Sequence, residues 1–187
     1  MNYEIIPEKE VVQKTADALM NNGFKVTIVD TKVEALAQVQ KLIPQGMSVM
    51  NGSSTSLEQI GFVEYLQSGQ HGWNNLHEAI LAEKDPATQM QLRMQSSFAQ
   101  YFLGSVHAIT EAGQLLSASA SGSQIAPYAF TTQNLILIAS TNKIVANLEN
   151  GIQRIHDYVF PLEDARMKSV GYPGSVMSKI LIHERES

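Results

Sequence analysis

Residues 95–142 read QSSFAQYFLGSVHAITEAGQLLSASASGSQIAPYAFTTQNLILIASTN, and Glu111 is the only formally charged side chain among them. Charged side chains are rarely buried without a partner, so a segment this poor in charge can enter the protein interior. Gly, Ser, Gln and Asn interrupt the segment, and it holds no apolar run long enough to span a bilayer. The stretch therefore predicts the inner strands of a parallel or mixed sheet, with uncharged polar loops at the strand ends. Ligands of open α/β sheets bind at the carboxyl ends of the strands, so most of a site wall is expected here.

The composition bounds the class of protein. A chain of 187 residues with 44% hydrophobic content predicts one globular domain over residues 1–187. A net charge of -5, without a cluster of Lys or Arg, argues against a nucleic-acid partner. The absence of cysteine excludes disulfides, thiolate-held iron–sulfur clusters and thiol nucleophiles. The first residues, MNYEIIPEKEVV, do not form a signal peptide, so a cytoplasmic protein without membrane association is expected.

Strand and helix patterns alternate along the chain, which predicts an α/β fold with three α/β/α layers and a mostly parallel, Rossmann-like sheet. The turn inside residues 104–120 is too short for a parallel crossover, so an antiparallel pair is favoured there. Apolar residues at helical spacing predict helices over residues 11–22, 33–43, 86–102 and 144–160. Runs of β-branched and apolar residues predict strands over residues 24–29, 47–50, 104–110, 114–120, 134–140 and 179–184.

Two apolar segments have a predicted place in the core. NLILIAS, residues 134–140, is the most continuously apolar strand and is expected at the centre of the sheet. The predicted helix 86–102 carries an apolar stripe that is expected to pack in the core. Its members are Met90, Met94, Phe98, Ala99 and Phe102.

The loop after the predicted strand 47–50 is the first candidate for ligand binding. NGSSTSLEQIGF, residues 51–62, places a glycine and four small hydroxyl residues between a strand and a helix. Such a turn exposes backbone N–H groups and hydroxyl donors that stabilise an anion. The alternative is a helix cap, with Glu58 or Gln59 completing a capping box, and both roles are compatible. The candidate residues are Gly52, Ser53, Ser54, Thr55 and Ser56.

Residues 119–124 and residues 140–143 also follow predicted strands and are rich in uncharged donors. Lys143 would bring a fixed positive charge towards a phosphate or carboxylate, while the alternative is an exposed lysine beside a helix start. Because parallel strands present their carboxyl ends at one edge, all three loops are expected to converge. The additional candidates are Ser119, Ser121, Gly122, Ser123, Gln124, Asn142 and Lys143.

Other polar residues carry weaker signals. His71, His77 and Glu78 fit no familiar metal-ligand spacing, so no metal site is expected and residues 68–85 are interpreted as a surface loop anchored by Trp73. His107 is expected to be a core histidine with a local partner, and Arg154 a surface residue.

Three blocks in the same order resemble the LUD-domain family, which is named for the lactate-utilisation protein C type. They are VMNGSSTSLEQIGF, the run from GSVHAITEAGQLLSASASGSQIAPYAF to LILIASTNKIV, and RIHDYVFPLEDAR. The resemblance implies the superfamily of ribose-phosphate isomerases, glucosamine-phosphate deaminases and CoA transferases. Its members hold phosphate or substrate with a small-residue loop after a strand, which supports residues 52–56 as a binding loop.

The resemblance also suggests a role for Glu111. A glutamate of CoA transferases accepts the acyl group, and Glu111 with the following Ala112-Gly113 is loosely similar, which makes it the candidate catalytic residue. The alternative is an exposed hairpin turn in which Gly113 takes a positive φ. Better-characterised relatives belong to a lactate-oxidation system with iron–sulfur proteins, but this chain has no cysteine to hold such a cluster.

The sequence thus predicts a protein that binds a small anionic metabolite: an organic acid, a CoA ester or a sugar phosphate. It would act as an enzyme of carboxylate or lactate metabolism, or, alternatively, as a non-catalytic subunit or interaction module with the same fold. A homo-oligomer or a partner protein is compatible with either role. The sequence identifies no cofactor.

Overall fold

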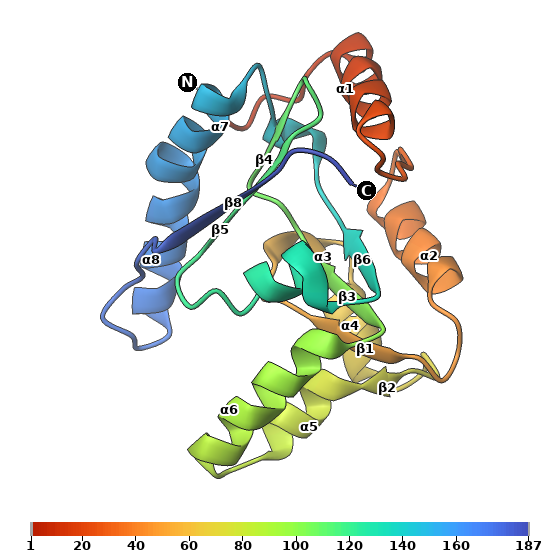
Figure 1. Cartoon of the computed structure of the whole chain (residues 1–187), viewed down its shortest axis with the longest axis vertical. Helices are drawn as coiled ribbons and strands as arrows, with labels where there is room; N and C mark the ends of the chain where they lie inside the picture. The colour runs from red at the N-terminus through yellow and green to blue at the C-terminus, as the bar shows by residue number, and fades with distance from the viewer. Residues whose placement is uncertain (1, 187) are drawn as a thin grey trace. The chain divides into compact units, whose positions relative to one another are not determined.

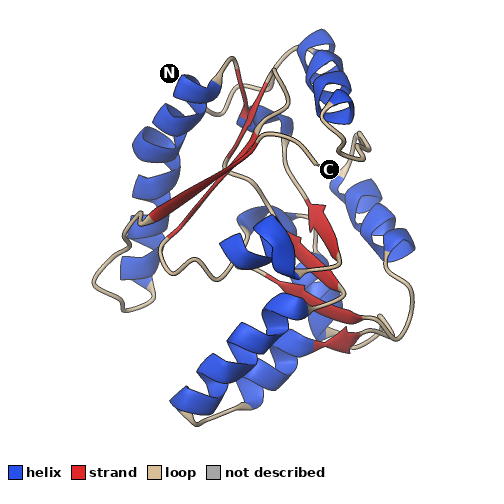
Figure 2. Ribbon diagram, in the orientation of Figure 1, coloured by secondary structure: helices blue, strands red, loops and turns tan. Residues whose placement is uncertain are grey.

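The computed structural model describes residues 2–186 and divides into two compact units, each with its own four-stranded sheet (Figures 1 and 2). Unit 1 comprises residues 2–28, 106–122 and 139–186, and unit 2 comprises residues 29–105 and 123–138. The chain therefore passes between the units four times. The expectation of one domain over the whole chain stays a prediction.

Unit 2 contains a fully parallel sheet in the order β2-β1-β3-β6. Parallel neighbours need crossover connections, and helices lie between β1 and β2 and between β2 and β3. This sheet confirms the predicted α/β class. Its strands are β1 (Ser48–Asn51), β2 (Asn74–Asn75), β3 (Tyr101–Gly104) and β6 (Asn134–Leu137).

The helices of unit 2 bury an apolar core that includes Val49, Leu57, Phe62, Trp73 and Leu103. Local signals set their ends, since a capping box between Thr31 and Glu34 begins the first helix and Asp85 caps the helix that starts at Pro86. The elements are α2 (Lys32–Leu42), α3 (Thr55–Gln59), α4 (Phe62–Gln67), α5 (Leu76–Ala82), α6 (Pro86–Gln95) and the short helices η1 (Ser96–Phe98) and η2 (Pro127–Thr131).

Unit 1 has a mixed sheet in the order β7-β4-β5-β8. The β4–β5 and β5–β8 pairs are antiparallel and the β4–β7 pair is parallel. The antiparallel pair predicted within residues 104–120 is thus confirmed as β4–β5. The strands are β4 (Ala108–Thr110), β5 (Leu115–Ser119), β7 (Ile144–Val145) and β8 (Lys179–His183).

Helix α7 packs against β4 in unit 1, where Ala108, Leu116 and Ile155 form a buried cluster. Gly151 permits this packing, because a Cβ at that position would lie 2.9 Å from Leu116. The helices are α1 (Lys9–Asn21), η3 (Thr141–Lys143), α7 (Leu148–Arg154), η4 (Ile155–Val159) and α8 (Phe160–Ser169).

Two strand predictions were wrong. Residues 24–29 form no strand, because their β-branched side chains favour extended backbone but no neighbouring segment supplies ladder bonds. Residues 104–110 are not one strand, since β3 ends at Gly104 and β4 begins at Ala108 in a different sheet. At the break, side chains of Tyr128, Lys143 and Arg154 bond the backbone in place of a strand partner.

The two core expectations also need correction. Met90, Met94 and Phe98 are exposed by 58%, 66% and 70%, and only Ala99 and Phe102 of the expected stripe are buried. The helix ends at Gln95, before Ala99 and Phe102, so these two residues do not continue the apolar face of Met90 and Met94. The strand in 134–140 covers Asn134–Leu137 and lies at the edge of its sheet, because an apolar run does not distinguish an edge strand from a central one.

Candidate functional site

Polar side chains gather at the carboxyl ends of β1 and β3 in unit 2. Asn51 ends β1 and is 5% exposed, and Ser56 is also buried. Ser105 directly follows β3, and its Oγ lies 3.3 Å from the Oγ of Ser56. This is the edge at which an open parallel sheet binds ligands.

Tyr128 fixes the backbone at Ser105. The N–H of Ser105 donates to the Tyr128 hydroxyl (2.9 Å), and that hydroxyl donates to the Ser105 carbonyl (3.0 Å). Burial raises the pKa of Tyr128 to about 12, so the hydroxyl keeps its proton at neutral pH. Gly104 is required beside it, because a Cβ there would lie 1.8 Å from the hydroxyl oxygen.

The loop Gly52–Ser56 combines a helix cap with a run of donors. Ser54 accepts a hydrogen bond from the N–H of Leu57 (3.3 Å), so the capping role is real. The N–H groups of Ser53, Ser54 and Thr55 donate no hydrogen bond to any of residues 2–186. The loop therefore carries both the cap and a set of uncommitted donors.

Gln124 lies against this loop. Its Nε2 donates to the Ser53 carbonyl (3.2 Å), and a Cβ on Gly52 would lie 2.6 Å from the same nitrogen. The absence of a side chain on Gly52 is thus what lets Gln124 approach.

His77 joins the same edge of unit 2. Its Nδ1 lies 3.2 Å from Oδ1 of Asn51. Burial and the nearby cation of Arg93 lower the pKa of His77 below its usual value. The sequence prediction considered His77 only as a metal ligand; the better signal was Asn51, a polar residue at the end of a buried strand.

His71 and Trp73, also in residues 68–85, make hydrogen bonds that stabilise the fold. His71 contacts the Leu66 carbonyl through Nε2 and the Trp73 N–H through Nδ1, while the Trp73 indole donates to the Ile43 carbonyl. The expected surface loop is wrong in part, because β2 and α5 lie in this segment, whereas the buried Trp73 confirms the expected anchor. Residues 2–186 hold no group of three His, Asp or Glu side chains placed for a metal ion.

In unit 1, two cations meet consecutive carbonyl groups. Lys143, in η3, donates to the carbonyl of Val106 (3.0 Å), and Arg154, at the end of α7, donates through Nη1 to the carbonyl of His107. Burial, with Arg154 nearby, lowers the pKa of Lys143 to about 8. Lys143 is only partly exposed, so the alternative of an exposed lysine is wrong.

Arg154 is 3% exposed, so its prediction as a surface residue was wrong. It shares the inner face of α7 with Gly151 and precedes the fully buried Ile155. Its guanidinium carbon lies 5.8 Å and 5.1 Å from the ring centres of Tyr3 and Tyr158. Within residues 2–186, Nε of Arg154 has no hydrogen-bond partner and no carboxylate forms a salt bridge with this side chain. The hydroxyl of Tyr3 is likewise buried without a partner in that range.

His107 completes this basic cluster of Lys143, Arg154 and His107. Its Nδ1 accepts a hydrogen bond from the N–H of Ala118 (2.9 Å), which confirms the expected local partner. Burial, together with the charges of Lys143 and Arg154, lowers the pKa of His107 to about 4, so the ring is neutral at pH 7.

The remaining loop candidates have local contacts. The N–H of Gly122 donates to Ser119 (2.9 Å), and Lys179 reaches the carbonyl of Ala120 (3.3 Å). The hydroxyl of Ser140 donates to the side chain of Asn142. Residues 119–122 and 140–143 belong to unit 1 and residues 52–56 with 123–124 to unit 2, so convergence of the three loops stays a prediction.

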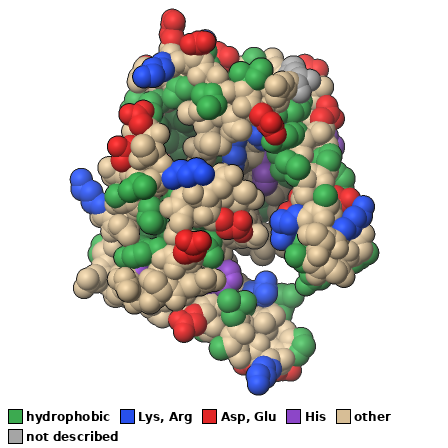
Figure 3. Space-filling model, turned by 180° about the vertical axis from the view of Figure 1, so that it is seen from behind, with side chains coloured by type: hydrophobic (Ala, Val, Ile, Leu, Met, Phe, Trp, Pro, Cys, Tyr) green, Lys and Arg blue, Asp and Glu red, His purple; other side chains and the backbone are tan. Residues whose placement is uncertain are grey.

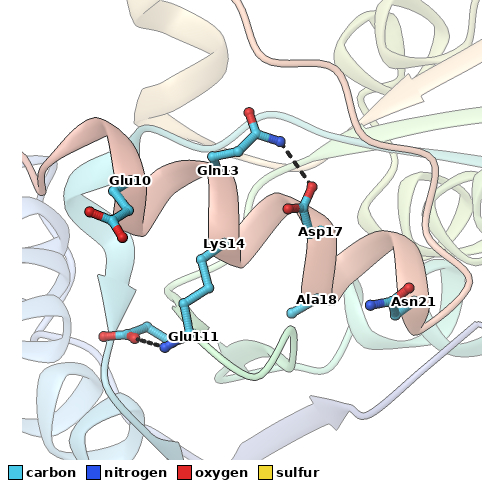
Figure 4. Close-up of a pocket in the computed structure, with 7 residues that line it drawn as sticks. All are labelled: Glu10, Gln13, Lys14, Asp17, Ala18, Asn21 and Glu111. Carbon is cyan, nitrogen blue, oxygen red and sulfur yellow. Dashed lines mark hydrogen bonds and ion pairs between the residues drawn. The ribbon is translucent and has the colours of Figure 1, made fainter.

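Glu111 lies in the turn between β4 and β5, where Gly113 has a φ of 82°. Its carboxylate pairs with Lys14 of α1 (3.0 Å), and both side chains are partly or largely exposed (Figure 4). The hairpin alternative is thus confirmed, and a catalytic role for Glu111 stays a prediction. The surrounding hollow is more acidic than basic and is lined by Glu10, Gln13, Lys14, Asp17, Ala18, Asn21 and Glu111.

Charged side chains are mixed over the surface seen in Figure 3, where Lys and Arg lie scattered among Asp and Glu. Of the helices within residues 2–186, none has the length and apolar character needed to cross a membrane.

The model of the family described as LUD domain matches residues 12–172, which is most of the chain. No curated protein and no solved structure matches the chain.

Proposed function

The chain belongs to the LUD domain family, and we propose that it binds a small oxyanion, the carboxylate or phosphate of a metabolite, at the basic cluster of Lys143, Arg154 and His107. The family resemblance supports an organic acid, a CoA ester or a sugar phosphate as the metabolite. The family name favours a role as an enzyme of carboxylate or lactate metabolism.

The observation that carries the proposal is the buried Arg154 side chain. Removing a guanidinium from water costs several kcal/mol unless an opposite charge or a full set of acceptors compensates it. Arg154 has one carbonyl and two aromatic rings around it, and no carboxylate of residues 2–186 forms a salt bridge with it. An oxyanion accepting from Nε would supply both a hydrogen bond and the compensating charge.

Lys143 strengthens the argument because its charge lies near that of Arg154. Burial lowers the pKa of Lys143, and the neighbouring cation of Arg154 lowers it further, because two like charges disfavour each other's charged form. An anion between or beside them reverses that effect, so binding at pH 8 should be accompanied by proton uptake at Lys143.

The loop residues are proposed to supply uncharged donors to the same class of ligand. Gly52–Ser56 offers backbone and hydroxyl groups, with Gln124 against it, and Ser119–Gly122 and Ser140–Asn142 offer hydroxyl and amide groups. Each set is tested by its own variant, since Ser53→Ala, Ser121→Ala and Asn142→Ala remove no core volume.

The test is a thermal-shift titration at pH 7 with inorganic phosphate, L-lactate and acetyl-CoA, because a ligand specific for the folded state raises apparent stability. We expect at least one probe to stabilise the protein and Lys143→Gln to weaken its binding about tenfold or more, the loss typical of a charged hydrogen bond. Lys41→Gln is the matched control, since Lys41 is an exposed lysine of α2 outside the proposed site. No stabilisation by any probe, or equal effects of the two variants, would contradict the proposal.

One observation favours the alternative of a non-catalytic interaction module. Met90, Met94 and Phe98 present a largely exposed apolar face on α6 and η1. A contiguous patch of exposed apolar side chains is typical of an interaction surface, whereas single exposed apolar side chains are common on any protein. Ligand binding without turnover, together with a complex lost in Met90→Gln/Met94→Gln, would favour this second function.

A further inference from the structure

Residues 2–7, which precede α1 and which we call the N-terminal strap, contact the Arg154 side chain. The ring of Tyr3 packs against that of Tyr158 in η4, with ring centres 5.5 Å apart. The guanidinium carbon of Arg154 lies 5.8 Å from the centre of the Tyr3 ring. All three residues belong to unit 1. The strap therefore contributes to the burial of Arg154, which is 3% exposed.

Two polar atoms at this contact are buried without a hydrogen-bond partner within residues 2–186. They are the hydroxyl of Tyr3 and Nε of Arg154. An aromatic ring attracts the guanidinium charge, but it does not replace an oxygen acceptor for an N–H or O–H group. Nearly all buried polar groups of folded proteins are paired, so two unpaired donors in contacting side chains indicate that an acceptor from outside the chain binds there.

A second contact attaches the strap to η4. The hydroxyl of Tyr158 donates to the carboxylate of Glu4 (3.2 Å). Burial, together with the hydrogen bond and charge of Glu4, raises the pKa of Tyr158, so this hydroxyl is a donor at neutral pH. Ile5 and Ile6 are exposed by 63% and 75%. Tyr3 and Glu4, rather than the two isoleucines, therefore attach the strap.

We propose that the hydroxyl of Tyr3 donates a hydrogen bond to the oxyanion that accepts from Nε of Arg154. This makes Tyr3 a ligand-binding residue and Tyr158, which holds the strap through Glu4, its positioning residue. The inference rests on the proposed oxyanion binding and goes beyond it by placing a residue of the strap in the site. One phosphate or carboxylate group offers acceptors for both donors, and its charge compensates that of Arg154.

The variant Tyr3→Phe removes only the hydroxyl and should act in opposite directions on stability and on binding. An unpaired buried hydroxyl destabilises the folded state, so the variant should raise the midpoint of thermal unfolding of the ligand-free protein. Its affinity for inorganic phosphate should fall about tenfold or more, the loss typical of a hydrogen bond to a charged group. Calorimetric titration at pH 7, with sodium chloride keeping the ionic strength constant, measures the affinity.

Tyr172→Phe is the matched control, because it removes the same group from a tyrosine of unit 1 that is 60% exposed. It should change neither the midpoint nor the phosphate affinity. Tyr158→Phe tests the positioning role, since it removes the hydrogen bond to Glu4 without changing a charge. It should weaken phosphate binding in the wild type but cause no further loss in Tyr3→Phe, which a double-mutant cycle measures.

The outcomes separate this inference from the proposed function. Phosphate binding that is equal in the wild type and Tyr3→Phe, or a lower unfolding midpoint in Tyr3→Phe, would overturn the role of Tyr3 and leave oxyanion binding intact. Additive losses in the cycle would overturn the positioning role of Tyr158. Binding of phosphate to none of the proteins, the wild type included, would overturn both the inference and the proposed function for this ligand.

Discussion

His107 is a base that the fold holds in its neutral form, and this gives the protein an acid-sensitive side chain. Burial and the neighbouring cations lower its pKa from 6.5 to about 4. The unfolded chain takes up a proton near pH 6.5 and the folded chain only near pH 4, so stability is lost as the pH falls through this window.

We expect His107→Gln to make the free energy of unfolding less dependent on pH between 6.5 and 4. The wild type should lose up to roughly 3 kcal/mol over that range, and the variant should lose less, because glutamine does not titrate but can still accept from the N–H of Ala118. Urea unfolding at pH 7 and pH 4.5 measures the difference. His156→Gln should retain the wild-type loss, and an unchanged pH dependence in His107→Gln would refute the role of this ring.

At the scale of single elements, α7 and β5 show how a glycine sets the distance between a helix and a sheet. A Cβ on Gly151 would lie 2.9 Å and 3.2 Å from the two methyl groups of Leu116, which is fully buried. Alanine normally stabilises a helix by about 1 kcal/mol relative to glycine, but here it must also displace a packed side chain.

Gly151→Ala should therefore destabilise the protein by about 1–3 kcal/mol, the usual cost of overpacking a core. Gln153→Ala, on the exposed side of α7, should change stability by less than about 0.5 kcal/mol. Gly151→Ala should cost less stability when it is introduced into Leu116→Val than when it is introduced into the wild type, because valine leaves room for the new methyl group. A double-mutant cycle measures this difference. Additive effects would mean that the two side chains do not compete for space.

The elements that the sequence predicted well are those with local signals. Helices α1 and α2, which have helical spacing of apolar residues, and strands β1, β5 and β8, which are short apolar runs, lie close to their predicted bounds. The division into two sheets was not predictable, because strand pairing depends on contacts between segments distant in sequence. The break at Ser105–His107 has the same origin, since three distant side chains bond its backbone.

The candidate site follows the same rule. Lys143 and Gln124 were found because they follow polar loops after strands. Arg154 and the Asn51–His77 pair were missed, because burial and pairing arise only when α7 meets β4 and when α5 meets β1. A sequence motif marks where a loop lies, but not which distant side chain meets it.

At the scale of the whole chain, neither compact unit is a continuous segment. Unit 1 takes three stretches of sequence and unit 2 takes two, so each unit closes loops that run through the other. If one unit unfolds, the segments that join the separate stretches of the other unit become flexible loops. Holding the ends of these loops together costs entropy and destabilises the unit that is still folded. The covalent path alone therefore favours a single cooperative transition and supports the predicted single domain.

Trp73 makes this prediction measurable, because it is the only tryptophan and is buried in the core of unit 2. We expect its fluorescence and the far-UV circular dichroism, which reports on both units, to change at the same urea concentration. Leu116→Ala in the core of unit 1 should cost about 2–5 kcal/mol, as large-to-small core substitutions do, and should move the Trp73 transition by the same amount. Leu81→Ala, at an exposed position of α5, should leave the midpoint unchanged. A Trp73 transition that ignores Leu116→Ala, or two separate transitions, would show that the units unfold independently and that the chain holds two domains.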